Sequence, residues 1–397
     1  MKDSWIVFCP AGEWQVQGIN EAKTLGYKIV SIDSSNDALG FKYSDDYINI
    51  NTDDHLNIIT SLKKKHINIV AAISYCSDIG IELCASIRQN FYLKGYDKQI
   101  AKNLINKLNQ RTLWERAELQ SNFSWKSFDN IKTASDYLIK SSSKKIIKPV
   151  DSSGSRGVSV VEKNENNLNY INEAFSFSKS NTIIIEDYVE GKEYTIEAFF
   201  TKKSSSILAI TKKNKLKSSN YTIANEIFTP NISKATREKI KKLIEKAAYA
   251  LGYFSGIAHI EIIIQKSGQI HLIELSGRGG GFGLNHFFVE KVSGLNPTRL
   301  TLYNELGRKL NLNSNWDKKG FIKYIPAKCG TIDKIEYPKI DGDTDVDINF
   351  FGKEGSHYKG SKSDGDRVGY VFCVSDNLNK AKKTVYDYYD KINIKYL

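Results

Sequence analysis

The sequence predicts an α/β fold followed by an α+β region, and three features of the 397-residue chain lead to that prediction. The first hundred residues alternate apolar strand segments with helical ones, which indicates crossover connections and a parallel sheet. Residues 256–283 alternate apolar and polar side chains on either side of a turn, which indicates an antiparallel hairpin. Short strands around a small-residue loop lie between these regions. We therefore expect two or three domains with separate cores.

The composition is that of a globular protein, with 41% hydrophobic and 26% charged residues. No apolar run is long enough to span a membrane, and the N-terminal MKDSWIVFCP lacks the pattern of a secretory signal. The five cysteines show no CxxC spacing, so we expect reduced thiols, a cytoplasmic location and no zinc site. The net charge is +12, but lysine is spread along the chain without an aromatic-interleaved stripe, so we expect no nucleic-acid or membrane partner.

The first 97 residues are predicted to form an open α/β domain. Strands are expected at Trp5–Cys9, Tyr27–Ile32 and Ile67–Ile73, with helices at Gln15–Leu25, Asp53–Lys65 and Ile79–Asn90. Asp33 follows the second strand, where dinucleotide-binding folds place a ribose-binding acid. The preceding turn lacks G-x-G-x-x-G, which argues against a nicotinamide or flavin site. We expect Asp33 to make a contact at the strand end instead.

Residues 98–189 are predicted to begin with helix, over 98–120, and to continue as strands around a small-residue loop. The segment KKIIKPVDSSGSRGVSVV places Lys148 on a short strand before that loop, residues 152–157, which we call the lid loop. Its amides and hydroxyls can cover phosphates, while Lys148 and Arg156 add positive charge. The order G-K-[ST] is missing, which excludes a Walker-type site. A plain glycine-rich hairpin is the alternative.

Residues 190–397 are predicted to form an α+β region around the hairpin. We expect a strand at Glu193–Phe200, a helix at Lys234–Leu251 and, after the hairpin, a helix at Thr298–Lys309. The last eighty residues are predicted to contain short strands, loops near Asp341–Asp347 and Glu354–Asp366, a strand at Val368–Val374 and a closing helix at Leu378–Lys391.

The hairpin carries the chemistry that organises the rest of the chain. Each of its strands places one carboxylate, Glu261 or Glu274, among aliphatic residues, with Ile270, Leu272 and Glu274 expected on one face. Two such carboxylates, completed by phosphate oxygens, suit Mg²⁺. Arg278 comes next, and its planar guanidinium group is always charged and can bind a phosphate or carboxylate. The three glycines after it allow the backbone to approach a ligand closely. An ordinary hairpin with glutamates paired to lysines remains the alternative.

Taken in order, these motifs resemble the ATP-grasp superfamily, and within it the carboxylate–amine ligase branch of amino-acid ligases and carbamoyl-phosphate-synthetase-like enzymes. The resemblance spans nearly the whole chain and rests on K-P at Lys148, G-S-x-G-V at Gly154, E-x-Y-x-x-G-x-E at Glu186 and G-x-x-H-x-E at Gly256. It implies a Rossmann-like pre-ATP-grasp domain (1–97), an ATP-grasp central or lid domain (98–189) and a C-terminal ATP-grasp domain with a terminal α+β extension (190–397).

The resemblance also assigns roles to individual residues. It implies that ATP is bound by Lys107, Lys148, Ser153, Gly154, Ser155, Gly157, Glu186, Tyr188, Val189 and Glu193, with Glu186, Tyr188 and Val189 at the adenine edge and Glu193 at the ribose. It implies one or two Mg²⁺ ions, replaceable by Mn²⁺, on Glu261, Glu274 and Ser276. Ser276 stands where the family usually has Asn, a departure that bears on the second metal. Arg278 is implied as the catalytic residue that steadies the γ-phosphate, and Lys213 as a further group reaching the site.

The implied reaction activates a small carboxylate as an acyl phosphate and joins it to an amine, such as an amino acid, releasing ADP and phosphate. The implied partners are therefore small-molecule carboxylate and amine substrates, with a homodimer as the common assembly of the superfamily. Two alternatives stay open at this point. One is a carboxylase of the same superfamily that activates bicarbonate, and the other is an ATP-binding protein without catalysis.

Overall fold

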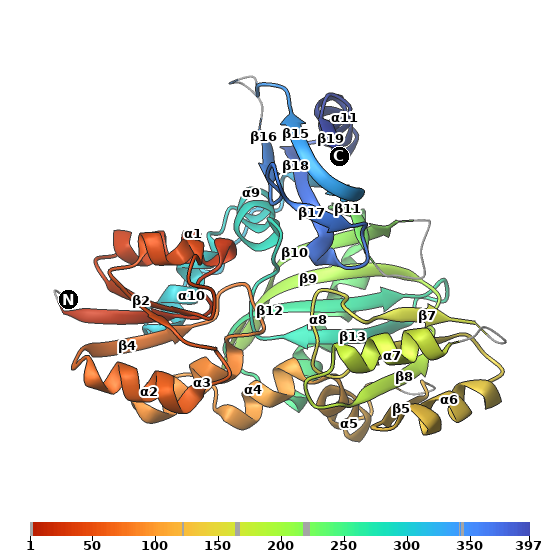
Figure 1. Cartoon of the computed structure of the whole chain (residues 1–397), viewed down its shortest axis with the longest axis horizontal. Helices are drawn as coiled ribbons and strands as arrows, with labels where there is room; N and C mark the ends of the chain where they lie inside the picture. Colours follow the sequence, from red (N-terminus) through yellow and green to blue (C-terminus); the bar gives the residue numbers. More distant parts are fainter. Residues whose placement is uncertain (1–2, 121–122, 163–166, 217–222, 341, 343–344) are drawn as a thin grey trace.

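The computed structural model describes residues 3–120, 123–162, 167–216, 223–340, 342 and 345–397. Figure 1 shows a small N-terminal sheet on the left, a long central sheet and a third, smaller sheet at the lower right. The C-terminal strands rise above the central sheet (Figure 1). This mixture of a parallel sheet with antiparallel ones confirms the predicted order of α/β followed by α+β structure.

The N-terminal sheet is fully parallel, in the order β3-β2-β1-β4, as the strand–helix alternation predicted. Its strands are β1 (Ser4–Phe8), β2 (Lys28–Asp33), β3 (Asp46–Asn49) and β4 (Asn68–Ile73), and its helices are α1 (Val16–Thr24), α2 (His55–Lys64) and α3 (Ile81–Asn90). The short strand β3 was not predicted. Asp33 ends β2 and accepts a hydrogen bond from the amide of Ala11 at 2.8 Å, which confirms a contact at the strand end.

The helical stretch after this sheet consists of two helices, α4 (Lys98–Ile105) and α5 (Lys107–Arg116), rather than one. Asn106 separates them with extended backbone angles, and its side chain caps α5 by accepting from the amide of Asn109. Lys107 therefore begins a helix, and its amide donates to the carbonyl of Val150 at 2.7 Å. The break fixes Lys107 against the strand that leads into the lid loop.

The third sheet, antiparallel in the order β5-β8-β6-β7, carries the lid loop between β6 and β7. Its strands are β5 (Trp125–Phe128), β6 (Lys145–Pro149), β7 (Ser159–Val161) and β8 (Ile183–Asp187). Helices α6 (Ile131–Lys140) and α7 (Leu168–Ser176) contribute buried residues to the same core. The other face of this sheet is thus available to a ligand.

The central sheet has eight strands in the order β13-β12-β9-β10-β11-β14-β18-β16. Those preceding the C-terminal region are β9 (Lys192–Thr201), β10 (Ser204–Lys215), β11 (Ala224–Phe228), β12 (Gly256–Ile264) and β13 (Ile270–Ser276). The amphipathic helix α8 (Lys234–Ala250) buries Ile240, Ile244 and Ala247 against one face, as its spacing predicted. Helices α9 (Glu290–Ser293) and α10 (Pro297–Glu305) follow the hairpin.

A β-bulge in the hairpin corrects one prediction. Glu261 lies opposite Glu274, but the next residue, Ile262, lies opposite Leu272, so Ile273 is an extra residue on β13. Leu272 consequently packs in the core, while Glu274 faces the other way, toward the cavity. The expectation that these two side chains share a face was wrong because simple alternation cannot register an inserted residue.

The C-terminal region completes the central sheet and adds a small one. It contains β14 (Lys319–Pro326), β15 (Cys329–Glu336), β16 (Val346–Phe350), β17 (His357–Lys359), β18 (Arg367–Ser375), α11 (Leu378–Tyr389) and β19 (Asn393–Tyr396). The sequence had predicted β18, the closing helix and a loop where β17 now lies. Asp341, in another predicted loop, lies outside the described residues. Within the described ranges, no helix is both long and apolar enough to cross a membrane.

Candidate active site

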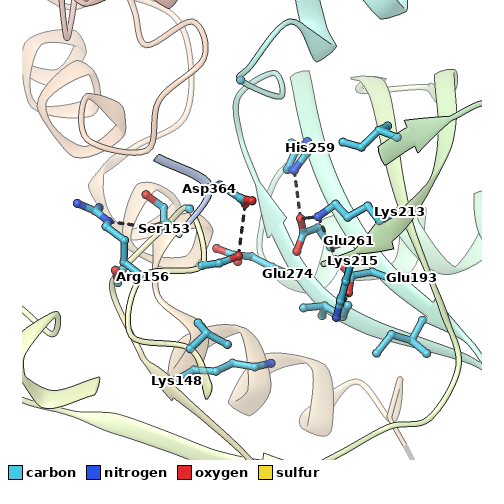
Figure 2. Close-up of a pocket in the computed structure, with 18 of the residues that line it drawn as sticks. Lys148, Ser153, Arg156, Glu193, Lys213, Lys215, His259, Glu261, Glu274 and Asp364 are labelled. Carbon is cyan, nitrogen blue, oxygen red and sulfur yellow. Dashed lines mark hydrogen bonds and ion pairs between the residues drawn. The ribbon is translucent and has the colours of Figure 1, made fainter. Parts of the chain in front are cut away.

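A cavity of about 1220 Å³ lies between the lid-loop sheet, the central sheet and the end of the N-terminal sheet. Its wall contains most of the residues that the sequence singled out, including Lys107, Lys148, Glu193, Glu261 and Glu274. These residues come from α5, β6, β9, β12 and β13, so the tertiary fold brings together positions more than 160 residues apart. Figure 2 shows Lys148 and Glu274 in the same close-up as Glu261 and Asp364.

A buried ion-pair cluster holds Lys148 in this wall. The Nζ atom of Lys148 lies 2.5 Å from Glu186 Oε2, and Arg111 Nε lies 2.5 Å from Glu186 Oε1. Burial alone would raise the pKa of Glu186, but the two cations outweigh it and hold that pKa at about 2. Burial also lowers the pKa of Lys148. Both carboxylate oxygens of Glu186 are therefore committed to cations, whereas the sequence had placed Glu186 at an adenine edge.

Arg111 was missed by the sequence analysis, although it lies one helical turn after Lys107. Its side chain is almost fully buried, and Nη2 donates to the carbonyl of Ile273 at 2.9 Å. A charged residue at position i+4 from a candidate ligand is a weak signal, because most such residues on helices are solvated. Arg111 becomes recognisable only once β13 is packed against α5.

Lys107 connects the lid loop to the metal-binding hairpin predicted from sequence. Its Nζ donates to the carbonyl of Ser152 at 2.7 Å and lies 3.3 Å from Glu274 Oε1. The side chain is 4% exposed, so a charge that sequence reasoning would normally place in solvent is held inside the protein. Lys107 and Lys148 thus form a pair of buried ammonium groups beside the lid loop.

The lid loop adopts left-handed backbone angles, with φ of 67° at Gly154, 61° at Ser155 and 69° at Gly157. Side chains disfavour this region, which explains the glycines at the first and last of these positions. Asp364, in the turn before β18, holds the loop from the other side of the cavity. Its amide donates to the carbonyl of Gly154 at 3.1 Å, and its carboxylate accepts from Ser155 at 3.4 Å. Ser153 also lines the cavity.

The two hairpin carboxylates lie directly opposite each other and each is balanced by a lysine. Glu261 contacts Lys213, and Glu274 contacts Lys107. Figure 2 shows the tips of Lys213 and His259 both directed toward Glu261. Burial would raise the pKa of Glu261, but Lys213 outweighs it and holds the pKa well below its usual range. The carboxylate is therefore ionised and available to a cation.

Glu193 continues this charged network along the central sheet. It lies 3.1 Å from Lys213 and 2.7 Å from Lys215, and it lines the cavity as predicted. On the other side of Glu261, His259 contacts Glu197, whose second oxygen accepts from the amide of Gly280 at 3.1 Å. The hairpin is thus tied to the glycine-rich turn that follows Arg278.

Arg278 lines the cavity, and Asp78 fixes its orientation. The Asp78 carboxylate accepts from Arg278 Nε at 3.1 Å and Nη2 at 2.8 Å, and it also accepts from the Ser276 hydroxyl. Burial would raise the pKa of Asp78, but Arg278 overcomes this and lowers it. Asp78 follows β4, and the carboxyl ends of parallel strands are where open α/β sheets bind ligands, so a sequence signal existed. Ser276 is not among the residues that line the cavity.

The segment between β8 and β9 forms the remaining wall. Tyr188 and Val189 line the cavity, and the amide of Tyr188 donates to the carbonyl of Lys144 at 3.1 Å. Apolar residues also line the cavity, and we call this set the apolar slot: Phe123, Ile146, Val189, Ile263 and Ile273. The cavity is therefore lined by apolar residues as well as by charged ones.

Several buried polar atoms of the lining residues lack a partner among the described residues, as expected where a polar ligand belongs. They are Arg111 Nη1, Ser152 Oγ, Arg367 Nε and both ring nitrogens of His271. In the part of the chain described, no group of three or more His, Cys, Asp or Glu side chains could hold a metal ion. Two opposed carboxylates fit Mg²⁺ when phosphate oxygens complete its coordination, so the donor set fits the metal together with a nucleotide.

Comparison with known proteins agrees with this geometry. Residues 142–286 match the ATP-grasp domain family, which spans the lid loop and the carboxylate hairpin. This part of the chain is therefore similar to ATP-grasp domains. This match confirms the family resemblance that the motif order had indicated.

The curated relatives of this chain include ligases and the large chain of carbamoyl phosphate synthase. The chain is 31% identical over 134 residues to a D-alanine–D-alanine ligase of Buchnera aphidicola subsp. Schizaphis graminum, an alignment that covers 33% of this chain and 43% of the relative. The chain spans less than half the length of the curated relatives it matches first.

Solved structures resemble this chain over its full length. An L-amino acid ligase of Bacillus licheniformis superimposes with a TM-score of 0.83 at 19% identity, covering 100% of this chain and 99% of that one. The biotin carboxylase domain of a Hydrogenobacter thermophilus 2-oxoglutarate carboxylase, solved with MgADP and bicarbonate, gives 0.75 at 16% identity, covering 100% and 91%. These likenesses establish a shared fold.

Proposed function

We propose that this protein is an ATP- and Mg²⁺-dependent ligase that activates a small carboxylate as an acyl phosphate and joins it to an amine, such as an amino acid. One observation carries the proposal. Glu261 and Glu274 lie directly opposite each other in one cavity, which also contains two buried lysines and the lid loop. Opposed carboxylates beside buried cations are suited to holding a metal–triphosphate complex.

The nucleotide would lie with its phosphates at the lid loop and its base in the apolar slot. Lys107 and Lys148 would contact the phosphates, with the amides and hydroxyls of residues 153–157 above them. Bound Mg²⁺, held by Glu261 and Glu274, would neutralise phosphate charge and orient the γ-phosphate. Ser276 is engaged by Asp78, so we leave it out of the metal set.

The carboxylate substrate would bind between the γ-phosphate and Arg278. One of its oxygens attacks the γ-phosphorus, the bond to the bridging oxygen breaks, and ADP leaves. Arg278, held in one orientation by Asp78, would stabilise the charge on the transferring group and on the acyl phosphate. An amine then attacks the acyl carbon, phosphate leaves, and an amide forms with loss of one proton.

The lid loop would exclude water during the lifetime of the acyl phosphate, which otherwise hydrolyses. Its contact with Asp364 supports this role, since the loop is held from both sides of the cavity. Substrate choice would be set by the N-terminal loops, the turn after Arg278 and the segment 211–229, of which residues 217–222 lie outside the described residues.

The test is ADP release from ATP and Mg²⁺ in the presence of pooled amino acids, pooled small carboxylic acids, pooled amines and bicarbonate, with each pool omitted in turn. Release that requires both a carboxylate and an amine supports the ligase. Release with bicarbonate alone would instead indicate a carboxylase. Tight ATP binding with no release in any combination would contradict the ligase and favour a nucleotide-binding role.

A further inference from the structure

His271 lies in the cavity wall with its hydrogen-bonding capacity unused. The residue is 6% exposed, and neither ring nitrogen has a partner within the described ranges of the chain. A neutral imidazole carries one donor and one acceptor, and burying such groups without partners is unfavourable. A ring in this state is suited to a ligand that supplies the missing partners.

The bulge at Ile273 explains why His271 faces the cavity. Leu272 packs in the core beside Ile262, so its neighbour His271 points to the opposite face of β13. The cross-strand partner of His271 is Ile263, which also lines the cavity. Beyond the bulge, Glu274 returns to the same face, so one strand presents both His271 and a candidate metal ligand.

The surroundings of His271 are apolar and aromatic, and the Arg111 guanidinium lies 5.6 Å from the centroid of the Phe123 ring. The Phe123 ring lies with its centroid 6.0 Å from that of His271 at an interplanar angle of 51°. Ile146, Val189 and Ile263 also line the cavity, and Ile263 lies directly opposite His271 on the neighbouring strand. Burial lowers the pKa of His271, so the ring is neutral at pH 7. A neutral ring in an apolar slot suits a flat heterocycle and is poorly suited to phosphate.

We propose that His271 hydrogen-bonds the edge of the nucleobase and is thereby a nucleotide-specificity residue of this site. The proposal rests on the proposed function, because it assumes that a nucleotide occupies the cavity. It assigns to a side chain a recognition task that the sequence had given to the segment between β8 and β9. A base edge presents donors and acceptors, and one of them can meet the ring nitrogen of His271 that faces the cavity.

The test compares His271→Phe with the parent protein by calorimetric titration of ATP and of 2′,3′-dideoxy-ATP, each with Mg²⁺. Phenylalanine keeps a flat ring but removes both nitrogens. We expect each affinity to fall about tenfold, as for the loss of one net hydrogen bond. His271→Asn, which keeps a donor and an acceptor, should recover part of that loss.

Thermal unfolding without nucleotide separates binding from a structural role. Because the His271 nitrogens are unpaired in the free protein, His271→Phe should leave the Tm unchanged or raise it. His55→Phe is the matched control. His55 shares a hydrogen bond of 2.9 Å with Ser86 in the N-terminal domain, so its loss should lower the Tm without changing ATP affinity.

Each result decides the matter. Unchanged ATP affinity in His271→Phe, or a loss seen with ATP but absent with the dideoxy nucleotide, would overturn the assignment to the base. A lowered Tm with proportionally weaker binding would show a structural role instead. If the parent protein binds ATP and releases ADP, and His271→Phe binds ATP with the same affinity, only the assignment of His271 to the base is wrong. If the parent binds no ATP, the proposed function fails with it.

Discussion

Replacing Glu186 with glutamine tests the buried cluster that holds Lys148. Arg111 and Lys148 lower the pKa of Glu186 from its ordinary 4.5 to about 2. Each pKa unit corresponds to about 1.4 kcal/mol, so the ionised carboxylate stabilises the folded protein by about 3 kcal/mol. Glu186→Gln also leaves two buried cations without an anion, and breaking such pairs typically costs about 3–5 kcal/mol. We therefore expect a loss of about 3 kcal/mol in the free energy of unfolding.

The assay is urea unfolding followed by tryptophan fluorescence at several pH values. Since the folded-state pKa of Glu186 is depressed, its contribution is fully present above the unfolded-state value near 4.5. It is lost as pH falls toward about 2. The difference between the parent and Glu186→Gln should therefore stay constant from pH 7 to about 5 and shrink below that. ATP affinity should also fall, because Lys148 loses the partner that orients it.

The matched control is Glu162→Gln, which removes an exposed pair with Lys144 at 2.9 Å. Exposed pairs contribute about 0–1 kcal/mol, so this variant should unfold almost like the parent. An equal effect of both substitutions would refute the reasoning. So would a Glu186→Gln difference that does not diminish in acid, because the stabilisation would then not depend on the ionised carboxylate.

Three further predictions follow from the described contacts. Glu274→Gln should lower ADP release at least about a hundredfold with an unchanged circular dichroism spectrum; near-parental turnover would remove Glu274 from the metal set. Asp364→Asn should loosen the lid loop, so trypsin should cut at Arg156 several times faster and the KM for ATP should rise; parental cleavage would contradict the contact's importance. Arg88→Met should lower the free energy of unfolding in urea by about 3–5 kcal/mol, because it leaves the buried Glu305 carboxylate without its ion-pair partner. An unchanged free energy of unfolding would mean that the Glu305 side chain turns to solvent in the variant.

The order of strands and helices could be predicted largely from sequence, because each element carries its own local signal. Alternation identified β9 and β12, helical spacing identified α8, and Gly252 marked its end with a φ of 79°. The types of residue that line the cavity could also be predicted from the sequence. Small residues, lysines and glutamates follow one another along the chain in the order and at the spacing of the motifs described above. These features depend on neighbours within a few positions along the chain.

The partnerships within the site needed the tertiary structure. Asp78 holds Arg278 across 200 residues, and Arg111 meets Glu186 across 75. No local pattern specifies such contacts, because they arise when separate sheets pack against each other. Inside the protein, the paired cations then hold the pKa values of Asp78 and Glu186 below those of an isolated peptide, although burial alone would raise them.

The register of β13 shows most clearly which features the sequence predicts and which only the tertiary structure decides. The sequence alone predicted that two strands would pair and that Glu261 and Glu274 would converge on one point, and both line the cavity. It could not locate the extra residue, Ile273, because a bulge is decided by how the paired strands and their neighbours pack. That single inserted residue sends Leu272 into the core and turns His271 toward the cavity, since adjacent side chains on a strand point to opposite faces.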